Sequence, residues 1–187
     1  MRLFVGVEID DAARRVAEET SEALRRAVGA RLRASWIPPA NMHLTVRFIG
    51  HVPEERVAAV LAALATPLRM ARFDVELGGC GAFPPAGTPR VIWIGLTQGL
   101  SSLSAMHDEF DRRLAPLGFE AERRPFSAHL TLARVKDAPR GSAALVRDAL
   151  RDVSVTHVRW SVERATVFRS HLSPRGARYE ALGRVVL

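Results

Sequence analysis

Two short segments of this chain carry residue types that can cleave a phosphodiester. His43-Leu-Thr-Val46 recurs in the second half of the chain as His129-Leu-Thr-Leu132. Each lies in an alternating stretch typical of a β-strand, so its histidine and threonine project from one face and the leucine between them from the other. We therefore expect each half of the chain to present one imidazole beside one hydroxyl.

Two imidazoles suit acid–base chemistry near neutral pH, because their unperturbed pKa is about 6.5. One can take a proton from a nucleophile while the other gives one to a leaving oxygen, each contributing about 10²–10⁴-fold. The hydroxyls of Thr45 and Thr131 can donate hydrogen bonds to the oxygens of a phosphate held between them. A lone His-x-Thr is typical of a half-buried polar pair, and it is the repetition that favours a phosphate-cleaving site.

The other reactive residue types do not form a second constellation. Cys80, the single cysteine, excludes an all-cysteine metal cage and lies in a glycine-rich stretch without a neighbouring histidine. That stretch, 78–85, runs into Phe-Pro-Pro and not into a helix, so it lacks the context of a nucleotide-binding loop. Trp36 and Trp93 are interpreted as packing residues. The remaining histidines show no metal-ligand spacing and are interpreted as structural or surface residues: His51, His107, His157 and His171.

The elements that position the two motifs can be predicted from periodicity and from glycine and proline positions. Strands are expected over 2–9, 42–49, 72–78, 90–97, 127–135, 153–169 and 178–186, and helices over 10–29, 53–65, 100–116 and 141–151. The segment 78–85 is expected to be a loop. Strands and helices are interspersed without a regular βαβ alternation, which indicates an α+β fold with antiparallel sheets.

The chain has 187 residues, of which 48% are hydrophobic and 25% charged, the values of an ordinary globular domain. Its apolar runs are far shorter than the roughly 18 residues needed to span a bilayer. Glu8 and Asp10 interrupt the apolar start, so we interpret it as a strand and not a signal peptide, and we expect a cytoplasmic protein.

The net charge of +7 favours a polyanionic partner such as RNA. Only Lys136 among the 27 basic residues is a lysine. This arginine bias is also typical of a GC-rich coding sequence, so the charge permits an anionic substrate without establishing one.

The paired H-x-T-x motifs make the chain resemble the 2H phosphoesterases, and in particular the RNA 2′,3′-cyclic phosphodiesterases, historically called 2′-5′ RNA ligases. The resemblance covers nearly the whole chain and includes the segments 2–6, 41–50, 81–84, 124–134 and 176–180. It implies a single domain over 1–187 with a bilobed, pseudo-twofold α+β fold. Two antiparallel sheets would face a central cleft, with helices on the outside.

The resemblance also implies roles for individual residues. His43 would be the proton donor to the departing O3′ and His129 the proton acceptor that activates water, while Thr45 and Thr131 would hold the phosphate. The residues alone leave the two motifs interchangeable, so this order rests on the resemblance. Two adjacent imidazoles would also push each other's pKa values apart, which would help one to act as acid and the other as base.

Two further residues match functional positions of the family. Arg134 matches an arginine that contacts the phosphate, but strict alternation puts it on the face opposite His129, so it must lie at a strand end or a bulge; the alternative is a surface arginine. Phe48 matches an aromatic position near the nucleotide, and alternation equally allows a core residue. Arg47 shares the His43 face by alternation, although the family does not require an arginine there.

The implied activity is hydrolysis of RNA 2′,3′-cyclic phosphate ends to 2′-phosphates, without a metal or cofactor. RNA is the expected partner, with no membrane or protein partner. A monomer is expected because one chain already holds both motifs. Alternatives are a phosphodiesterase for a small cyclic nucleotide or ADP-ribose cyclic phosphate, and a non-catalytic module that binds RNA ends.

ATP-independent 2′-5′ ligation remains open as the reverse of the hydrolytic chemistry. An adenylating ligase needs a nucleophilic lysine. Lys136 has no nucleotide-binding glycine nearby, so we reject covalent adenylation.

Overall fold

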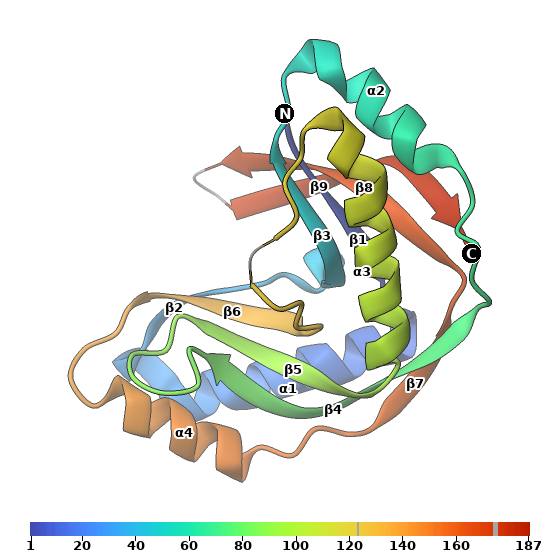
Figure 1. The fold of residues 1–187 in the computed structure, drawn as a ribbon. Coiled ribbons are helices and arrows are strands. Elements are labelled where there is room, and N and C mark those ends of the chain that lie inside the picture. The colour runs from blue at the N-terminus through green and yellow to red at the C-terminus, as the bar shows by residue number, and fades with distance from the viewer. Residues whose placement is uncertain (123, 174–175) are drawn as a thin grey trace.

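The computed structural model describes residues 1–122, 124–173 and 176–187, and it confirms an α+β fold (Figure 1). The strands in these residues are β1 (Arg2–Glu8), β2 (Arg33–Trp36), β3 (His43–His51), β4 (Phe73–Phe83), β5 (Val91–Gln98), β6 (Leu130–Asp137), β7 (Val158–Val162), β8 (Arg164–Ser173) and β9 (Gly176–Val186). The α-helices are α1 (Asp11–Val28), α2 (Glu54–Ala65), α3 (Leu100–Leu114) and α4 (Ser142–Asp152), and three short 3₁₀ turns, η1 (Gly29–Arg31), η2 (Pro39–Asn41) and η3 (Ala115–Leu117), join them.

The strands form two antiparallel halves. One half has the order β7-β4-β5-β6, with β2 also paired to β6, and the other has the order β3-β1-β8-β9. A single antiparallel pair, Leu44 with Leu130, joins β3 to β6 and makes the halves one continuous sheet. The two sheets expected from the sequence are therefore hydrogen-bonded to each other at one point.

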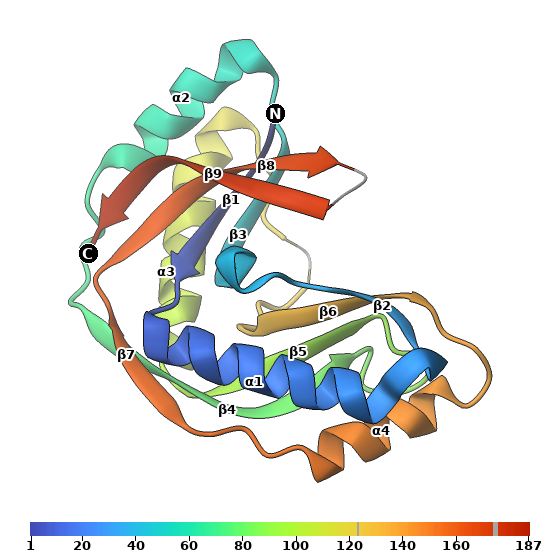
Figure 2. The same cartoon turned by 180° about the vertical axis from the view of Figure 1, so that it is seen from behind.

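The two halves exchange helices: each half is covered by a helix that follows, in the chain, a strand of the other half. Helix α1 follows β1 but packs with α4, β6 and β7, whereas α3 follows β5 but packs on β3 and α2 (Figures 1 and 2). The Asp10 carboxylate caps α1 by accepting from the Ala13 N–H at 2.7 Å, and an apolar stripe on that helix, including Ala17, Leu24 and Val28, is buried. None of the helices in the described residues is long and apolar enough to cross a bilayer.

The predicted loop over 78–85 was wrong, because β4 continues to Phe83. The pairing of β4 with β5 passes from Leu77 directly to Cys80, so Gly78 and Gly79 form a bulge within the strand. Gly79 has a φ of +69°, which favours glycine. These glycines thus bend a strand and do not end it.

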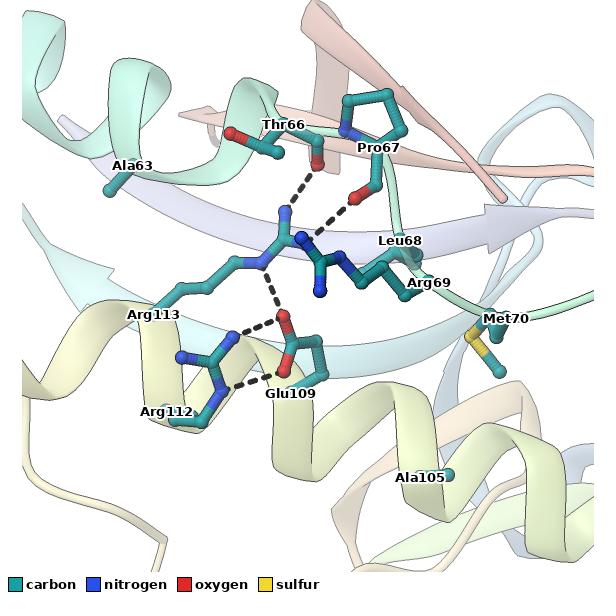
Figure 3. Close-up of a pocket in the computed structure, with 10 residues that line it drawn as sticks. All are labelled: Ala63, Thr66, Pro67, Leu68, Arg69, Met70, Ala105, Glu109, Arg112 and Arg113. Atoms are coloured by element: carbon teal, nitrogen blue, oxygen red, sulfur yellow. Dashed lines mark hydrogen bonds and ion pairs between the residues drawn. The ribbon is translucent and has the colours of Figure 1, made fainter.

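A cavity of about 630 Å³ lies between α3 and the chain that leaves α2 (Figure 3). Three arginines line this cavity. The Arg113 side chain is only 9% exposed, and its guanidinium is bonded to groups of the protein itself. Its guanidinium donates to Glu109 at 2.7 Å and to backbone carbonyls of Leu64, Thr66 and Pro67 at the end of α2. Arg113 is therefore the C-terminal cap of α2 and ties that helix to α3.

We expect Arg113→Ala to lower the free energy of unfolding by about 1–3 kcal/mol, because it removes the partners of several helix-end carbonyls. Arg112 is the matched control, since it binds the same Glu109 carboxylate but is 72% exposed. Arg112→Ala should lower the free energy of unfolding much less, because an exposed ion pair contributes little to stability. Urea denaturation of both variants measures the difference, and equal losses would contradict a capping role for Arg113.

Candidate active site

The two histidine–threonine segments meet at the centre of the sheet. Leu44 and Leu130 pair there, and both leucine side chains are fully buried. Because side chains alternate along a strand, the histidine and threonine of each segment project from the opposite face. Continuing the antiparallel register places each histidine across from the threonine of the other segment. Two imidazoles and two hydroxyls therefore gather around one region between the halves.

His43 is the first residue of β3, and its ring is held on several sides. Nδ1 donates to the Asn41 carbonyl at 2.8 Å, and Nε2 lies 3.0 Å from the Thr45 hydroxyl. The ring stacks on Phe4 with centroids 4.7 Å apart and stands perpendicular to Tyr179 at 5.1 Å. Because a carbonyl can only accept, the neutral ring has its proton on Nδ1 and Nε2 accepts from the threonine.

His129 directly precedes β6 and repeats this arrangement. Its Nδ1 donates to the Ser127 carbonyl at 2.7 Å. The ring stands perpendicular to Phe83 with centroids 5.1 Å apart and tilts against Trp93 at 6.3 Å. In both segments a carbonyl two residues upstream therefore fixes the same tautomer and leaves Nε2 as the nitrogen available for chemistry.

Burial lowers the pKa of both imidazoles below the ordinary value, against the opposing effect of the hydrogen bonds to Asn41 and Ser127. The positive charge of Arg134 lowers the pKa of both His43 and His129, and the charge of His129 lowers the pKa of His43. One arginine acts on both imidazoles, so the three groups share one electrostatic environment. Both rings are thereby biased toward the neutral form at pH 7.

Arg134 reaches this environment because of a bulge in β6. The pairing of β6 with β5 skips Leu132, while Thr131 and Ala133 face successive residues of β5. The extra residue reverses the alternation: Leu132 and Ala133 are both fully buried, and Arg134 is exposed. From the sequence, Arg134 could share the face of His129 only if it lay at a strand end or a bulge. The bulge at Leu132 meets that condition, and Arg134 shares the face of Thr131.

A matching bulge in β3 overturns the predicted orientation of Arg47. The pairing of β3 with β1 skips Val46, so Arg47 turns to the face opposite His43 and is only 5% exposed. The prediction that it shares the His43 face was wrong for this reason. Phe48 is 44% exposed and pairs with Phe4, the residue that stacks on His43. Phe48 therefore lies on the histidine face and not in the core.

Sequence reasoning did not identify the aromatic residues that pack against the imidazoles, namely Phe4, Phe83 and Tyr179. The alternation of β1 could have indicated Phe4 and also Gly6, which lies beneath the first imidazole. A Cβ built on Gly6 would stand 3.2 Å from Cδ2 of His43 and 3.1 Å from the Leu44 carbonyl oxygen. Glycine at this position therefore gives the ring its space.

The described residues contain no group of three or more His, Cys, Asp or Glu side chains arranged to hold a metal ion. His157 contacts Glu76 and His171 contacts Glu180 on the exposed surface, and His107 is buried away from both motifs' reactive nitrogens. The Cys80 thiol lies 3.5 Å from the Leu150 carbonyl, and burial raises its pKa. Such a thiol is poorly suited to act as a nucleophile.

Comparison with known families agrees with this geometry. The model of the 2′-5′ RNA ligase superfamily matches residues 10–174, which include both motifs. The chain belongs to the 2′-5′ RNA ligase superfamily. A protein of Aeropyrum pernix named RNA 2′,3′-cyclic phosphodiesterase is 41% identical over 144 residues, covering 76% of this chain and 80% of the relative. One of the same name from Archaeoglobus fulgidus is 32% identical over 97% of this chain and 98% of the relative.

Solved structures with the same fold include two that cover the whole chain. TT0787 of Thermus thermophilus superposes with a TM-score of 0.78 at 30% identity, covering 100% of this chain and 98% of that one. The apo form of Escherichia coli LigT gives a TM-score of 0.73 at 24% identity, covering 100% and 96% of the two chains. The bilobed architecture expected from the sequence is thus confirmed as that of this superfamily.

Arg134→Met should raise the pKa of both His43 and His129, because it removes a positive charge that disfavours both imidazolium forms. Arg134→Lys keeps the charge and should leave both pKa values lowered. An NMR pH titration of the two ring Hε1 signals measures this. Unchanged titration of either imidazole in the methionine variant would show that the arginine charge does not reach it.

Proposed function

We propose that this protein hydrolyses RNA 2′,3′-cyclic phosphate ends to 2′-phosphates by acid–base catalysis between His43 and His129. The observation that carries the proposal is the Leu44–Leu130 pair, which brings two histidine–threonine segments to one face of a chain in this superfamily. Relatives that bear the name RNA 2′,3′-cyclic phosphodiesterase support the same reaction and substrate.

The phosphate binds between the two halves. The hydroxyls of Thr45 and Thr131 donate to its nonbridging oxygens, and the guanidinium of Arg134 supplies two parallel donors and a fixed charge. In the free protein the Thr45 hydroxyl donates to Nε2 of His43 at 3.0 Å. Substrate binding replaces that bond with one to phosphate, which frees Nε2 to carry a proton.

His129 acts as the base. Its Nε2 takes a proton from water as the water oxygen attacks phosphorus, and its lowered pKa keeps it unprotonated beforehand. His43 gives a proton from Nε2 to O3′ as the bond between phosphorus and O3′ breaks. The phosphate charge offsets the repulsion from Arg134 and so stabilises the proton on His43. The 2′-phosphate leaves, and solvent restores the two protonation states.

Phe48 is placed to contact the nucleotide. Its exposed ring lies on the histidine face, and the Arg2 guanidinium stands over it with 5.5 Å between Cζ and the ring centroid. An aromatic ring with a cation beside it suits a base joined to phosphates. We place the activity in the cytoplasm, on RNA, in a monomer that needs no metal or protein partner.

A short RNA with a 2′,3′-cyclic phosphate, incubated in excess EDTA, should be converted to a 2′-phosphate end. His43→Ala and His129→Ala should each lower kcat by about 10²–10⁴-fold, because each removes one proton-transfer group. The measurement is chromatography of the RNA ends, with His157→Ala as the control because that side chain is 61% exposed. Turnover only with added divalent ion would contradict the metal-free mechanism. Binding of the RNA without turnover would favour an RNA-end binding module.

The acid and base can be assigned with a substrate in which sulfur replaces the bridging O3′. A thiolate leaves without needing a proton, since the pKa of a thiol is about 8.5. His43→Ala should therefore recover most of its lost rate on this substrate, and His129→Ala should not. Recovery in the His129 variant instead would reverse the two assignments.

A further inference from the structure

A buried polar cluster lies behind the first motif, on the face of β3 opposite His43. It consists of Arg47 on β3 and of His107 and Asp111 on α3. Arg47 is 5% exposed, His107 6%, and the Asp111 side chain 16%. Burying two full charges and an imidazole is costly unless every group is paired. None of these three residues takes part in the proposed proton transfers or phosphate contacts.

Each group of the cluster is paired, and most of its bonds go to backbone carbonyls. The Arg47 guanidinium donates through Nε to Asp111 Oδ1, through Nη1 to the Phe48 carbonyl at 2.6 Å and through Nη2 to the Glu120 carbonyl at 2.5 Å. The His107 Nδ1 donates to the Val46 carbonyl at 2.8 Å, and its Nε2 lies 3.3 Å from Asp111 Oδ2. The cluster therefore binds the backbone of β3 at the residues before and after Arg47, Val46 and Phe48.

The same cluster also holds the connection that leads to the second motif. Glu120 and Phe126 lie on the described part of the chain between α3 and β6. The Phe126 ring stacks on His107 with centroids 4.7 Å apart. The next residue, Ser127, provides the carbonyl that binds Nδ1 of His129. Polar and ring contacts thus run from the backbone after the first motif to the residue that orients the second imidazole.

The second half of the molecule shows that a bulge of this kind does not by itself need such a cluster. Ala133 occupies the position equivalent to Arg47 and is fully buried. The carbonyl of the bulge residue Leu132 accepts from the backbone N–H of Ile37 at 2.8 Å. Backbone bonding and a methyl group suffice there. In the first half, the cluster additionally binds the chain segment between α3 and β6, which leads to His129.

We propose that Arg47, His107 and Asp111 are positioning residues that set the placement of His129 relative to His43. The proposal rests on the proposed function, since it concerns the geometry between the two proton-transfer groups. The three side chains are largely buried on the face of β3 opposite His43, so they do not face the proposed phosphate position. They act by fixing the β3 bulge and the chain before His129 to the same rigid helix.

The test uses Asp111→Asn, which keeps the shape of the side chain and removes its charge. The matched control is Asp108→Asn, the same change at an exposed position on α3. Relative to the control, Asp111→Asn should lower kcat about 10–100-fold with KM changed less than about threefold, as expected for misplaced catalytic groups. Rates are taken per folded molecule, well below the melting temperature of each variant.

A second measurement does not depend on turnover. Asp111→Asn should shift the Hε1 NMR signal of His129, which the cluster does not touch directly, and Asp108→Asn should leave it in place. If the wild type fails to hydrolyse the cyclic phosphate, the proposed function falls while this shift still tests the positioning role. An unshifted His129 signal, or a kcat equal to that of the control, would overturn the positioning role.

Arg47→Lys serves as the second variant and applies even if Asp111→Asn does not fold. A lysine keeps the positive charge beside Asp111 but lacks the planar fork that reaches the Phe48 and Glu120 carbonyls together. Arg47→Lys should also lower kcat, but by a smaller factor than Asp111→Asn does. A kcat at the wild-type value would contradict the requirement for the fork.

Discussion

The pairing of Leu44 with Leu130 is the contact on which the site depends. It is the only pair recorded between β3 and β6 in the described residues, and both side chains are buried in the core. With these leucines turned inward, alternation obliges the flanking histidines and threonines to face the other way. One apolar pair at the pseudo-twofold centre thus places four polar side chains around one region. Of the two helices exchanged between the halves, α3 packs on β3 and α1 packs on β6, the two strands that this pair joins.

Two equivalent bulges follow the motifs, and the different residues placed after them make this symmetric arrangement chemically asymmetric. Each motif has one unpaired residue directly after its threonine, Val46 in β3 and Leu132 in β6. The residue two positions further returns to the histidine face, and it is Phe48 in one half and Arg134 in the other. On that face, one half therefore presents an aromatic ring and the other presents a guanidinium. The same extra residue turns Arg47 inward, where it binds α3.

The sequence predicted the parts of the site that depend on local patterning. Alternation and turn signals located most strands and all four helices, and the repeated His-x-Thr segments identified the residues that meet at the centre. Bulges leave little trace in the alternation of side chains, so Arg47 was placed on the wrong face. Gly78 and Gly79 were interpreted as a loop for the same reason, although they form a bulge within β4. The contact of Arg47 with Asp111 depends on the packing of α3, which local patterning does not reveal.

In the proposed reaction, both halves of the molecule act on one phosphorus atom. The most direct test is a crystal structure with a uridine 2′,3′-cyclic vanadate, which mimics the five-coordinate state of the reaction. We expect one vanadium centre with Nε2 of His43 and of His129 on opposite sides, each about 3 Å from a vanadate oxygen. The hydroxyls of Thr45 and Thr131 should contact the equatorial oxygens. A vanadate bound to one half alone, with the other imidazole turned away, would contradict it.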